Sequence, residues 1–214
     1  MTAIETDLCV IGAGSGGLSV AAGAVQMGAK VVLIEAGAMG GDCLNTGCVP
    51  SKALLHAGAD GLDWKEAHAH VRATVERIAP HDSVERFEGL GVTVLKGFAQ
   101  FTGPDAVAVG DTEIRARRFV LATGAGPFVP DIPGLADLRF LTNETIFDLP
   151  ERPSHLIVLG GGPIGIEMAQ AHRRLGCDVT VVEAAKALGR EDPDAAKPVL
   201  DALIAEGVEI VENT

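Results

Sequence analysis

Two segments of the chain follow the same pattern, and this repeat constrains the fold more than any other feature of the sequence. The first segment starts at Leu8 and reads LCVIGAGSGGLSVAAGAVQMGAKVVLIEA; the second starts at Leu156 and reads LIVLGGGPIGIEMAQAHRRLGCDVTVVEA. Each contains an apolar run, a G-x-G-x-x-G motif, an amphipathic stretch, a Gly and a second apolar run that ends in Glu. This order predicts a strand, a tight turn, a helix and a second strand, present twice in the chain.

The glycines of each motif occupy the positions that a dinucleotide-binding turn requires. The first Gly allows the turn from strand to helix, the second lets backbone N–H groups approach a pyrophosphate, and the third lets the helix lie close to the strand. The phosphates then lie at the helix N-terminus, where unpaired N–H groups favour negative charge. These glycines are Gly12, Gly14 and Gly17 in the first copy and Gly160, Gly162 and Gly165 in the second.

An acidic residue ends each repeat, 23 residues after the first Gly in both copies. Glu35 and Glu183 are therefore predicted to accept hydrogen bonds from a ribose. A carboxylate repels the extra 2′-phosphate of NADP, so Glu183 favours NAD at the second site, although Lys186 and Arg190 follow closely and weaken this preference. Two such sites in one chain predict two dinucleotides and electron transfer between them.

The sequence between the two copies predicts one helix and a small β layer. The apolar side chains of WKEAHAHVRATVERIA recur at helical spacing, and a Pro follows. Three strand-like runs come next, VTVLKGFAQF, DAVAV and RRFVLATG, and they predict a small antiparallel layer. We therefore predict an α/β fold with two Rossmann-like dinucleotide-binding domains, the first over residues 1–150 and the second, incomplete, over residues 151–214.

Charge and composition exclude several classes of partner. The net charge is −12, from 17 basic and 29 acidic residues, so the chain repels phosphate backbones and anionic lipid. We therefore expect neither nucleic acid nor a membrane as a partner. The first residues include acids and lack a basic region ahead of an apolar stretch, so we expect no export signal and a cytoplasmic location. Paired cysteines in such a reducing compartment are seldom structural.

Cys43 and Cys48 lie in the segment GGDCLNTGCVPSKALL, and three kinds of chemistry compete to explain them. Zinc sites usually combine two closely spaced Cys pairs or add His ligands. The other two cysteines, Cys9 and Cys177, lie far apart in the sequence and form no second pair, so we predict no metal-binding residues. A structural disulfide that closes so short a loop would stabilise the fold little. A redox-active pair agrees better with the sequence, because a helix that begins near Cys48 favours its thiolate form.

Backbone geometry adds an expectation about this segment. Residues five apart in a regular helix diverge by about 140° around its axis, so bridged cysteines would require a break in the helix. Asn45 and Gly47 give the backbone the freedom for such a break. Lys52 follows Cys48 by four residues and therefore lies on nearly the same helix face. It is either a solvated surface side chain or a cation beside a flavin, with Glu167 of the second repeat as its candidate partner.

These segments, in this order, resemble the flavin-containing pyridine nucleotide–disulfide oxidoreductases, which include dihydrolipoamide dehydrogenase, glutathione reductase and mercuric reductase. The matching segments are VIGAGSGG, GGDCLNTGCVPSKALL, FVLATG and VLGGGPIGIE, and the resemblance covers essentially the whole chain. It implies FAD at the first repeat and a nicotinamide cofactor at the second, where the charge of Glu183 favours NAD over NADP. The residues implied for FAD are Gly12, Gly14, Gly17, Glu35, Gly41, Asp42, Lys52, Thr123 and Gly124. Those implied for the nicotinamide cofactor are Gly160, Gly162, Gly165, Glu167 and Glu183, with Glu167 near Lys52 at the flavin.

The resemblance also implies an electron relay. Electrons would pass between the nicotinamide cofactor, FAD and a Cys43–Cys48 disulfide, with Cys48 against the flavin and Cys43 exchanging with the substrate. The implied partner is a small-molecule or protein-bound disulfide or dithiol such as lipoamide, or Hg(II). A dihydrolipoamide dehydrogenase-like enzyme is the first choice because Glu183 favours NAD. The alternatives are a mercuric reductase-like enzyme and, outside enzymes, a redox-responsive flavin-binding module.

The sequence departs from the family pattern in two respects. Asp42 stands where dihydrolipoamide dehydrogenase and glutathione reductase typically carry Thr, and its negative charge beside the cysteines bears on substrate preference. The chain also stops partway through the nicotinamide domain. We therefore expect an N-terminal fragment, inactive by itself, that lacks the dimerisation domain and its His–Glu acid/base pair. The full-length protein is expected to be a homodimer.

Overall fold

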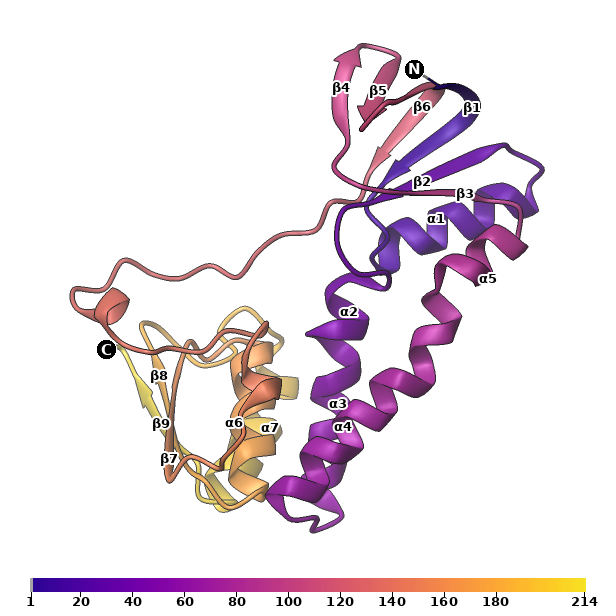
Figure 1. The fold of residues 1–214 in the computed structure, drawn as a ribbon. Helices are drawn as coiled ribbons and strands as arrows, with labels where there is room; N and C mark the ends of the chain where they lie inside the picture. The colour runs from indigo at the N-terminus through magenta and orange to yellow at the C-terminus, as the bar shows by residue number, and fades with distance from the viewer. Residues whose placement is uncertain (1) are drawn as a thin grey trace. The chain divides into compact units, whose positions relative to one another are not determined.

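The computed structural model describes residues 2–214, which form two compact units (Figure 1). The first unit contains the residues up to Cys48 and Val75–Glu144; the second contains Val49–Thr74 and Thr145–Thr214. Each unit holds one copy of the repeat and its own sheet, so the predicted α/β class is confirmed. Residues 49–74 pack with the second repeat. The assignment of residues 1–150 to FAD and of residues 151–214 to a nicotinamide cofactor concerns ligands and stays a prediction.

A six-stranded sheet in the order β3-β2-β1-β6-β5-β4 forms the centre of the first unit. Its parallel strands are β1 (Thr2–Ile11), β2 (Val31–Glu35), β3 (Thr93–Lys96) and β6 (Thr112–Leu121). Its antiparallel strands, next to β6, are β5 (Ala106–Val109) and β4 (Gln100–Gly103). The predicted antiparallel layer is thus continuous with the parallel sheet. The third predicted run, RRFVLATG, instead supplies the end of β6, which pairs in parallel with β1, and residues 112–115 of β6 form the antiparallel pairs with β5. The run VTVLKGFAQF divides into β3, which pairs in parallel with β2, and β4.

The central strands of this sheet are apolar because side chains cover both of its faces. The side chains of Val31 to Ile34 in β2 are all buried, as is typical of a parallel strand between two layers. On one face, α1 (Ser15–Gln26) and α5 (Val84–Gly89) contribute side chains to a core with β1 and β2. On the other face, a second core gathers side chains of β1, β2, β5 and β6.

A helical segment follows β2. It comprises α2 (Gly41–Asn45), α3 (Cys48–Ala59), α4 (Trp64–Ile78) and the 3₁₀ helix η1 (Ala79–Asp82). The helix predicted from WKEAHAHVRATVERIA is therefore confirmed as α4. After β6, the chain reaches the second repeat through a long stretch that contains only two 3₁₀ helices, η2 (Leu135–Asp137) and η3 (Ile146–Asp148). This stretch includes the predicted Pro-rich connector. None of the helices within residues 2–214 is long and apolar enough to span a bilayer.

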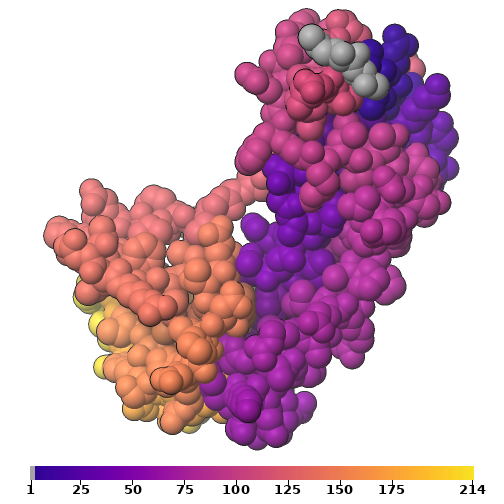
Figure 2. All heavy atoms as spheres, viewed as in Figure 1, coloured from indigo at the N-terminus to yellow at the C-terminus, as the bar shows by residue number. Residues whose placement is uncertain are grey.

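The second unit is built on a three-stranded parallel sheet in the order β7-β8-β9. Its elements are β7 (His155–Leu159), α6 (Pro163–Arg174), β8 (Asp178–Glu183), α7 (Pro193–Ala205) and β9 (Glu209–Glu212). One core joins α6 and α7 to the sheet, and another joins α6 to α3 and α4. In Figure 2, residues 49–74 lie directly against the second repeat. This contact is close because Gly58 lacks a side chain, and a Cβ there would lie 2.8 Å from Cβ of Arg174.

Candidate functional site

The glycine loop of the first unit joins β1 to α1 and leaves no room for side chains. A Cβ on Gly12, whose φ is +105°, would lie 2.1 Å from the carbonyl oxygen of Ala122. A Cβ on Gly17 would lie 1.8 Å from the carbonyl oxygen of Gly12. Gly14 caps α1 without a side-chain hydrogen bond. Because no side chain caps the first amides of α1, this end of the helix suits a phosphate group.

The glycine loop of the second unit repeats this geometry between β7 and α6. Gly160 has φ of +104°, and a Cβ on Gly165 would lie 2.0 Å from its carbonyl oxygen. Gly162 caps α6 without a side-chain hydrogen bond and has open space where a side chain would lie. The structure therefore contains two loops of the same shape, as the sequence repeat predicts.

Segments far apart in the sequence meet at the first loop. A Cβ on Gly41, the first residue of α2, would lie 2.6 Å from Cα of Gly14. The chain after β6 also contacts the loop, since a Cβ on Gly12 would lie 3.1 Å from the backbone nitrogen of Thr123. Gly124 follows with φ of +69° and open space around it. Gly12, Gly14, Gly41 and the backbone of Thr123 therefore meet at one turn of the chain.

The acid that ends each repeat is held by backbone amides. In the first unit, the N–H groups of Ala13 and Gly37 donate to Oε2 and Oε1 of Glu35, both over 2.6 Å. The carboxylate thus bridges the glycine loop and the turn after β2. This is the position in which an acid at the end of the second strand binds a ribose.

Glu183 makes the equivalent bonds in the second unit. The N–H of Gly161 donates to its Oε2 over 2.7 Å, and the N–H of Ala185 donates to its Oε1 over 2.9 Å. The N–H groups of Ala185 and Gly161 lower the pKa of Glu183, and the positive charge of Arg190 adds to the effect. Glu183 therefore carries a negative charge beside the second loop at neutral pH.

The two cysteines lie on either side of a break between two helices. Cys43 is in α2, and Cys48 is the first residue of α3. The N–H of Thr46 donates to the carbonyl oxygen of Asp42 over 2.9 Å, and a Cβ on Gly47 would lie 2.8 Å from that oxygen. The predicted break in the helix is therefore present, and Gly47 is required for it. Both cysteines are thiols in this structure.

The two thiols have different surroundings. Cys43 is half-buried and Cys48 is exposed. Burial raises the pKa of Cys43, and the side chain of Cys48 raises it further. A hydrogen bond with the Cys48 backbone opposes this effect, and the negative charge of Asp82 adds to it. Cys43 is therefore protonated at neutral pH. The sulfur of Cys48, at the start of α3, is left as the more accessible of the two.

An ion pair connects α3 with α6 in the second unit. Nζ of Lys52 lies 2.7 Å from Oε1 of Glu167, which is the pairing expected from the sequence. The hydroxyl of Ser51 donates to the same oxygen over 2.9 Å. Sequence reasoning missed Ser51, because a single hydroxyl next to a lysine has no distinctive spacing. It also missed Asp82, which lies 39 residues from Cys43 in the chain.

The whole chain matches known proteins of one kind. The family model for pyridine nucleotide-disulphide oxidoreductases matches residues 6–214. The chain belongs to this family. The family comprises FAD-dependent oxidoreductases that act on sulfur groups and use a nicotinamide dinucleotide, and the resemblance stated from the sequence is thereby confirmed.

Curated relatives and solved structures agree with this membership. The mercuric reductase of Lysinibacillus sphaericus is 34% identical over 97% of this chain and 41% of its own length. The dihydrolipoyl dehydrogenase of Thermus scotoductus is 34% identical over 97% of this chain and 49% of its own length. The HOCl-induced flavoprotein disulfide reductase RclA from Escherichia coli has a TM-score of 0.88 and 32% identity, over 97% of this chain and 49% of RclA. The chain thus spans less than half the length of these relatives.

The other two cysteines of this family member are buried in its cores. Burial raises the pKa of Cys9 to about 11, and burial also raises the pKa of Cys177. Both are therefore protonated at neutral pH and pack as small apolar side chains. Within residues 2–214, no group of three His, Cys, Asp or Glu side chains is arranged to hold a metal ion.

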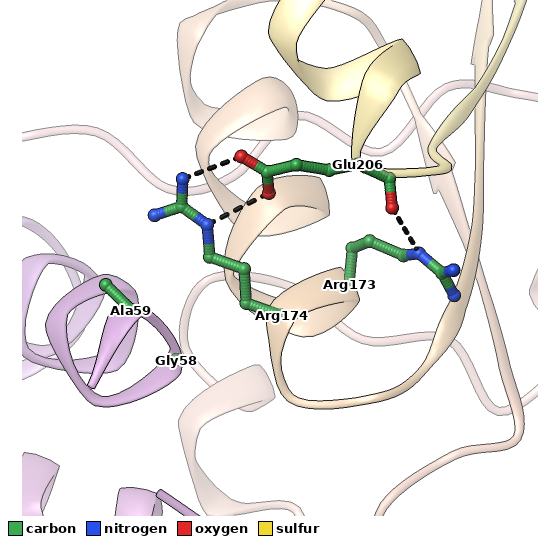
Figure 3. Close-up of a pocket in the computed structure, with 5 residues that line it drawn as sticks. All are labelled: Gly58, Ala59, Arg173, Arg174 and Glu206. Carbon is green, nitrogen blue, oxygen red and sulfur yellow. Dashed lines mark hydrogen bonds and ion pairs between the residues drawn. The ribbon is translucent and has the colours of Figure 1, made fainter. Parts of the chain in front are cut away.

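A pocket of about 440 Å³ in the second unit is lined by Gly58, Ala59, Arg173, Arg174 and Glu206, none of which belongs to a glycine loop (Figure 3). Arg174 donates to both carboxylate oxygens of Glu206, over 2.9 and 2.7 Å, and Arg173 donates to the carbonyl oxygen of Glu206 over 2.8 Å. The charged groups of the pocket therefore satisfy one another. We interpret them as a contact that joins α6 to the end of α7, and not as part of the oxidoreductase site.

Proposed function

We propose that this protein passes electrons between a nicotinamide dinucleotide and a substrate by way of FAD and the pair Cys43 and Cys48. The observation that carries the proposal is the break between α2 and α3, which leaves Cys43 half-buried in α2 and Cys48 exposed at the start of α3. A cysteine exposed at a helix start suits the thiolate form, and its neighbour would exchange with a substrate after losing its proton, since only a thiolate attacks. Closure of the disulfide would release two electrons and two protons.

FAD is proposed for the first unit. The glycine loop and the uncapped start of α1 would hold its pyrophosphate, and Glu35 would bind a ribose hydroxyl. The residues proposed to surround the rest of the cofactor are Gly41, Asp42, Lys52, Thr123 and Gly124. Bound FAD would supply the two-electron chemistry, and the chain would supply binding, orientation and charge.

NAD is proposed in preference to NADP at the second loop, because Glu183 carries a negative charge there. We expect Glu183→Gln to shift the ratio of the NADPH and NADH dissociation constants about tenfold toward NADPH, since a neutral amide no longer repels the 2′-phosphate. Calorimetric titration with each nucleotide measures both constants. Glu35→Gln, at the equivalent position of the first repeat, is the control and should leave the ratio unchanged. An unchanged ratio in Glu183→Gln would contradict the preference.

Hg(II) and a dihydrolipoamide-like dithiol are the two candidate substrates. Glu183, which favours NAD, supports the dithiol. Several curated relatives are mercuric reductases, which supports Hg(II). Charge supports it also: Asp42 is next to Cys43 in the chain, and Asp82 is close enough to raise the pKa of Cys43. Since negative charge beside the thiols attracts a cation, we place Hg(II) first. As a separate proposal, the full-length protein is a homodimer.

An anaerobic titration with NADH, followed by visible absorption after loading with FAD, tests the relay. We expect a long-wavelength absorption band that is lost in Cys48→Ser and kept in Cys43→Ser, because only Cys48 is proposed to lie against the flavin. Bleaching of bound flavin without this band would refute the relay. If the band forms but neither Hg(II) nor dihydrolipoamide is turned over by the full-length protein, the redox-responsive module replaces the enzyme as the better explanation.

A further inference from the structure

A buried hydroxyl supports the ion pair between α3 and α6. The side chain of Glu167 is 19% exposed, and its Oε1 receives both Nζ of Lys52 at 2.7 Å and the hydroxyl of Ser51 at 2.9 Å. The side chain of Lys52 is 60% exposed, whereas Ser51 is only 5% exposed. One carboxylate oxygen thus has one flexible, solvated partner and one fixed, buried partner.

These two contacts are not equivalent. An ion pair with an exposed lysine gains little, because solvent screens it and a long side chain must be ordered. The hydroxyl of Ser51 is already positioned by the packing of α3, and a hydrogen bond to a carboxylate is stronger than one between neutral groups. The short Ser side chain also loses little entropy when it is fixed. We propose that Ser51 is a positioning residue that fixes the carboxylate of Glu167 and, through it, the amine of Lys52.

This inference deepens the proposed function and rests on it for its consequence. Lys52 and Glu167 are proposed to lie near the flavin and the nicotinamide, where a displaced charge would slow electron transfer. Ser51 has no proposed contact with either cofactor and is proposed to act on Lys52 through Glu167. The arrangement itself is a property of the chain, so it is testable in the protein without FAD.

An acylating reagent tests how firmly the amine of Lys52 is held. The rate of modification is measured by mass spectrometry on the FAD-free protein. We expect Ser51→Ala and Glu167→Gln each to raise this rate roughly threefold, which corresponds to the loss of a weak ion pair. Ser51→Thr keeps the hydroxyl and should retain the original rate. Lys65, exposed on α4, is the internal control, and its rate should not change.

A double variant separates positioning from a general loosening of the fold. In a Glu167→Ala background, Ser51→Ala should add nothing, because no side-chain oxygen remains at position 167 for the Ser51 hydroxyl to fix. An unchanged Lys52 rate in Ser51→Ala, an additive effect in the double variant, or an equal rise at Lys65 would each overturn the proposal. Ser19→Ala, which removes an exposed helical hydroxyl of α1, should leave Lys52 unaffected.

The same variants loaded with FAD distinguish this inference from the proposed function. We expect Ser51→Ala and Lys52→Gln to slow flavin reduction by NADH about tenfold, with little further loss in the double variant. If labelling of Lys52 changes as expected and flavin reduction does not, the positioning role is supported and the proposed role of Lys52 beside the flavin fails. If Lys52→Gln slows reduction but Ser51→Ala does not, the positioning role is overturned instead.

Discussion

Gly17→Ala is expected to lower the free energy of unfolding by at least about 3 kcal/mol, whereas Gly23→Ala in the same helix should raise it by about 0.5–1 kcal/mol. A Cβ on Gly17 would lie 1.8 Å from the carbonyl oxygen of Gly12, and backbone there cannot move without separating α1 from β1. Gly23 has no atom within 4 Å of a Cβ position, so Ala only removes the conformational entropy of Gly in the unfolded chain.

Denaturant unfolding of the two variants measures this difference directly. Gly165→Ala provides an independent test in the second repeat, because its Cβ would lie 2.0 Å from the carbonyl oxygen of Gly160. We expect it to be as harmful as Gly17→Ala. A loss below about 1 kcal/mol at both positions would show that the helix can shift away from the strand at low cost, and the steric argument for the third glycine of each motif would then be wrong.

The same steric argument explains why the two glycine loops could be predicted from the sequence. The third glycine of each motif is required by a contact five residues away, that of Gly17 with Gly12 and of Gly165 with Gly160, so the spacing in the sequence reflects the shape of the loop. The break between Cys43 and Cys48 is equally local, since Gly47 packs against the carbonyl of Asp42. The glycine turn and the helix break each depend on a short stretch of chain, so the sequence of that stretch is enough to predict them.

Pairings over long distances could not be predicted in the same way. The run VTVLKGFAQF is apolar enough for strands but does not show that β3 pairs in parallel with β2 while β4 pairs with β5. The contact of Ser51 with Glu167 spans 116 residues, and the packing of residues 49–74 on the second repeat depends on which helix face meets α6. Apolar periodicity identifies a buried face and not its partner.

Two buried histidines in the second unit make its stability sensitive to acid. His172 is fully buried and His68 is 5% exposed. Nδ1 of His68 lies 2.9 Å from the carbonyl oxygen of Phe147, and Nδ1 of His172 lies 2.8 Å from that of Met168. Since a carbonyl only accepts, both rings carry their proton on Nδ1. Among residues 2–214, neither Nε2 has a hydrogen-bond partner, and protonation there would place a charge in an apolar core.

The groups around the two rings set the direction of their titration. Burial lowers the pKa of both histidines below the ordinary value of 6.5, against the opposing effect of the two carbonyls. The charge of Arg72 lowers the pKa of His68 further, Asp148 raises it, and His68 lowers the pKa of His172. The ring of Trp64 covers both, with centroid distances of 4.4 Å to His68 and 5.8 Å to His172. Burial is the first cause for each, so the neutral form is favoured in the folded state.

We therefore expect the free energy of unfolding to be constant above about pH 6.5 and to fall below it. For a base whose pKa is lower in the folded state, the unfolded chain binds the proton first, so stability decreases from the unfolded pKa down to the folded one. The slope is at most about 1.4 kcal/mol per pH unit for each histidine. Urea unfolding at a series of pH values between 7.5 and 5, followed by the emission of Trp64, the single tryptophan, measures this slope.

Asparagine variants connect the slope to these two rings. His68→Asn and His172→Asn keep an amide N–H near the position of Nδ1 but cannot be protonated, so each should flatten the profile and the double variant should remove most of the slope. His70→Asn, exposed on the same helix as His68, is the matched control and should retain it. Carboxylates with lowered pKa, such as Glu206, destabilise the fold only as they are protonated, below their ordinary value of 4.5. A slope above pH 5 that persists in the double variant would therefore show that the acid sensitivity arises elsewhere.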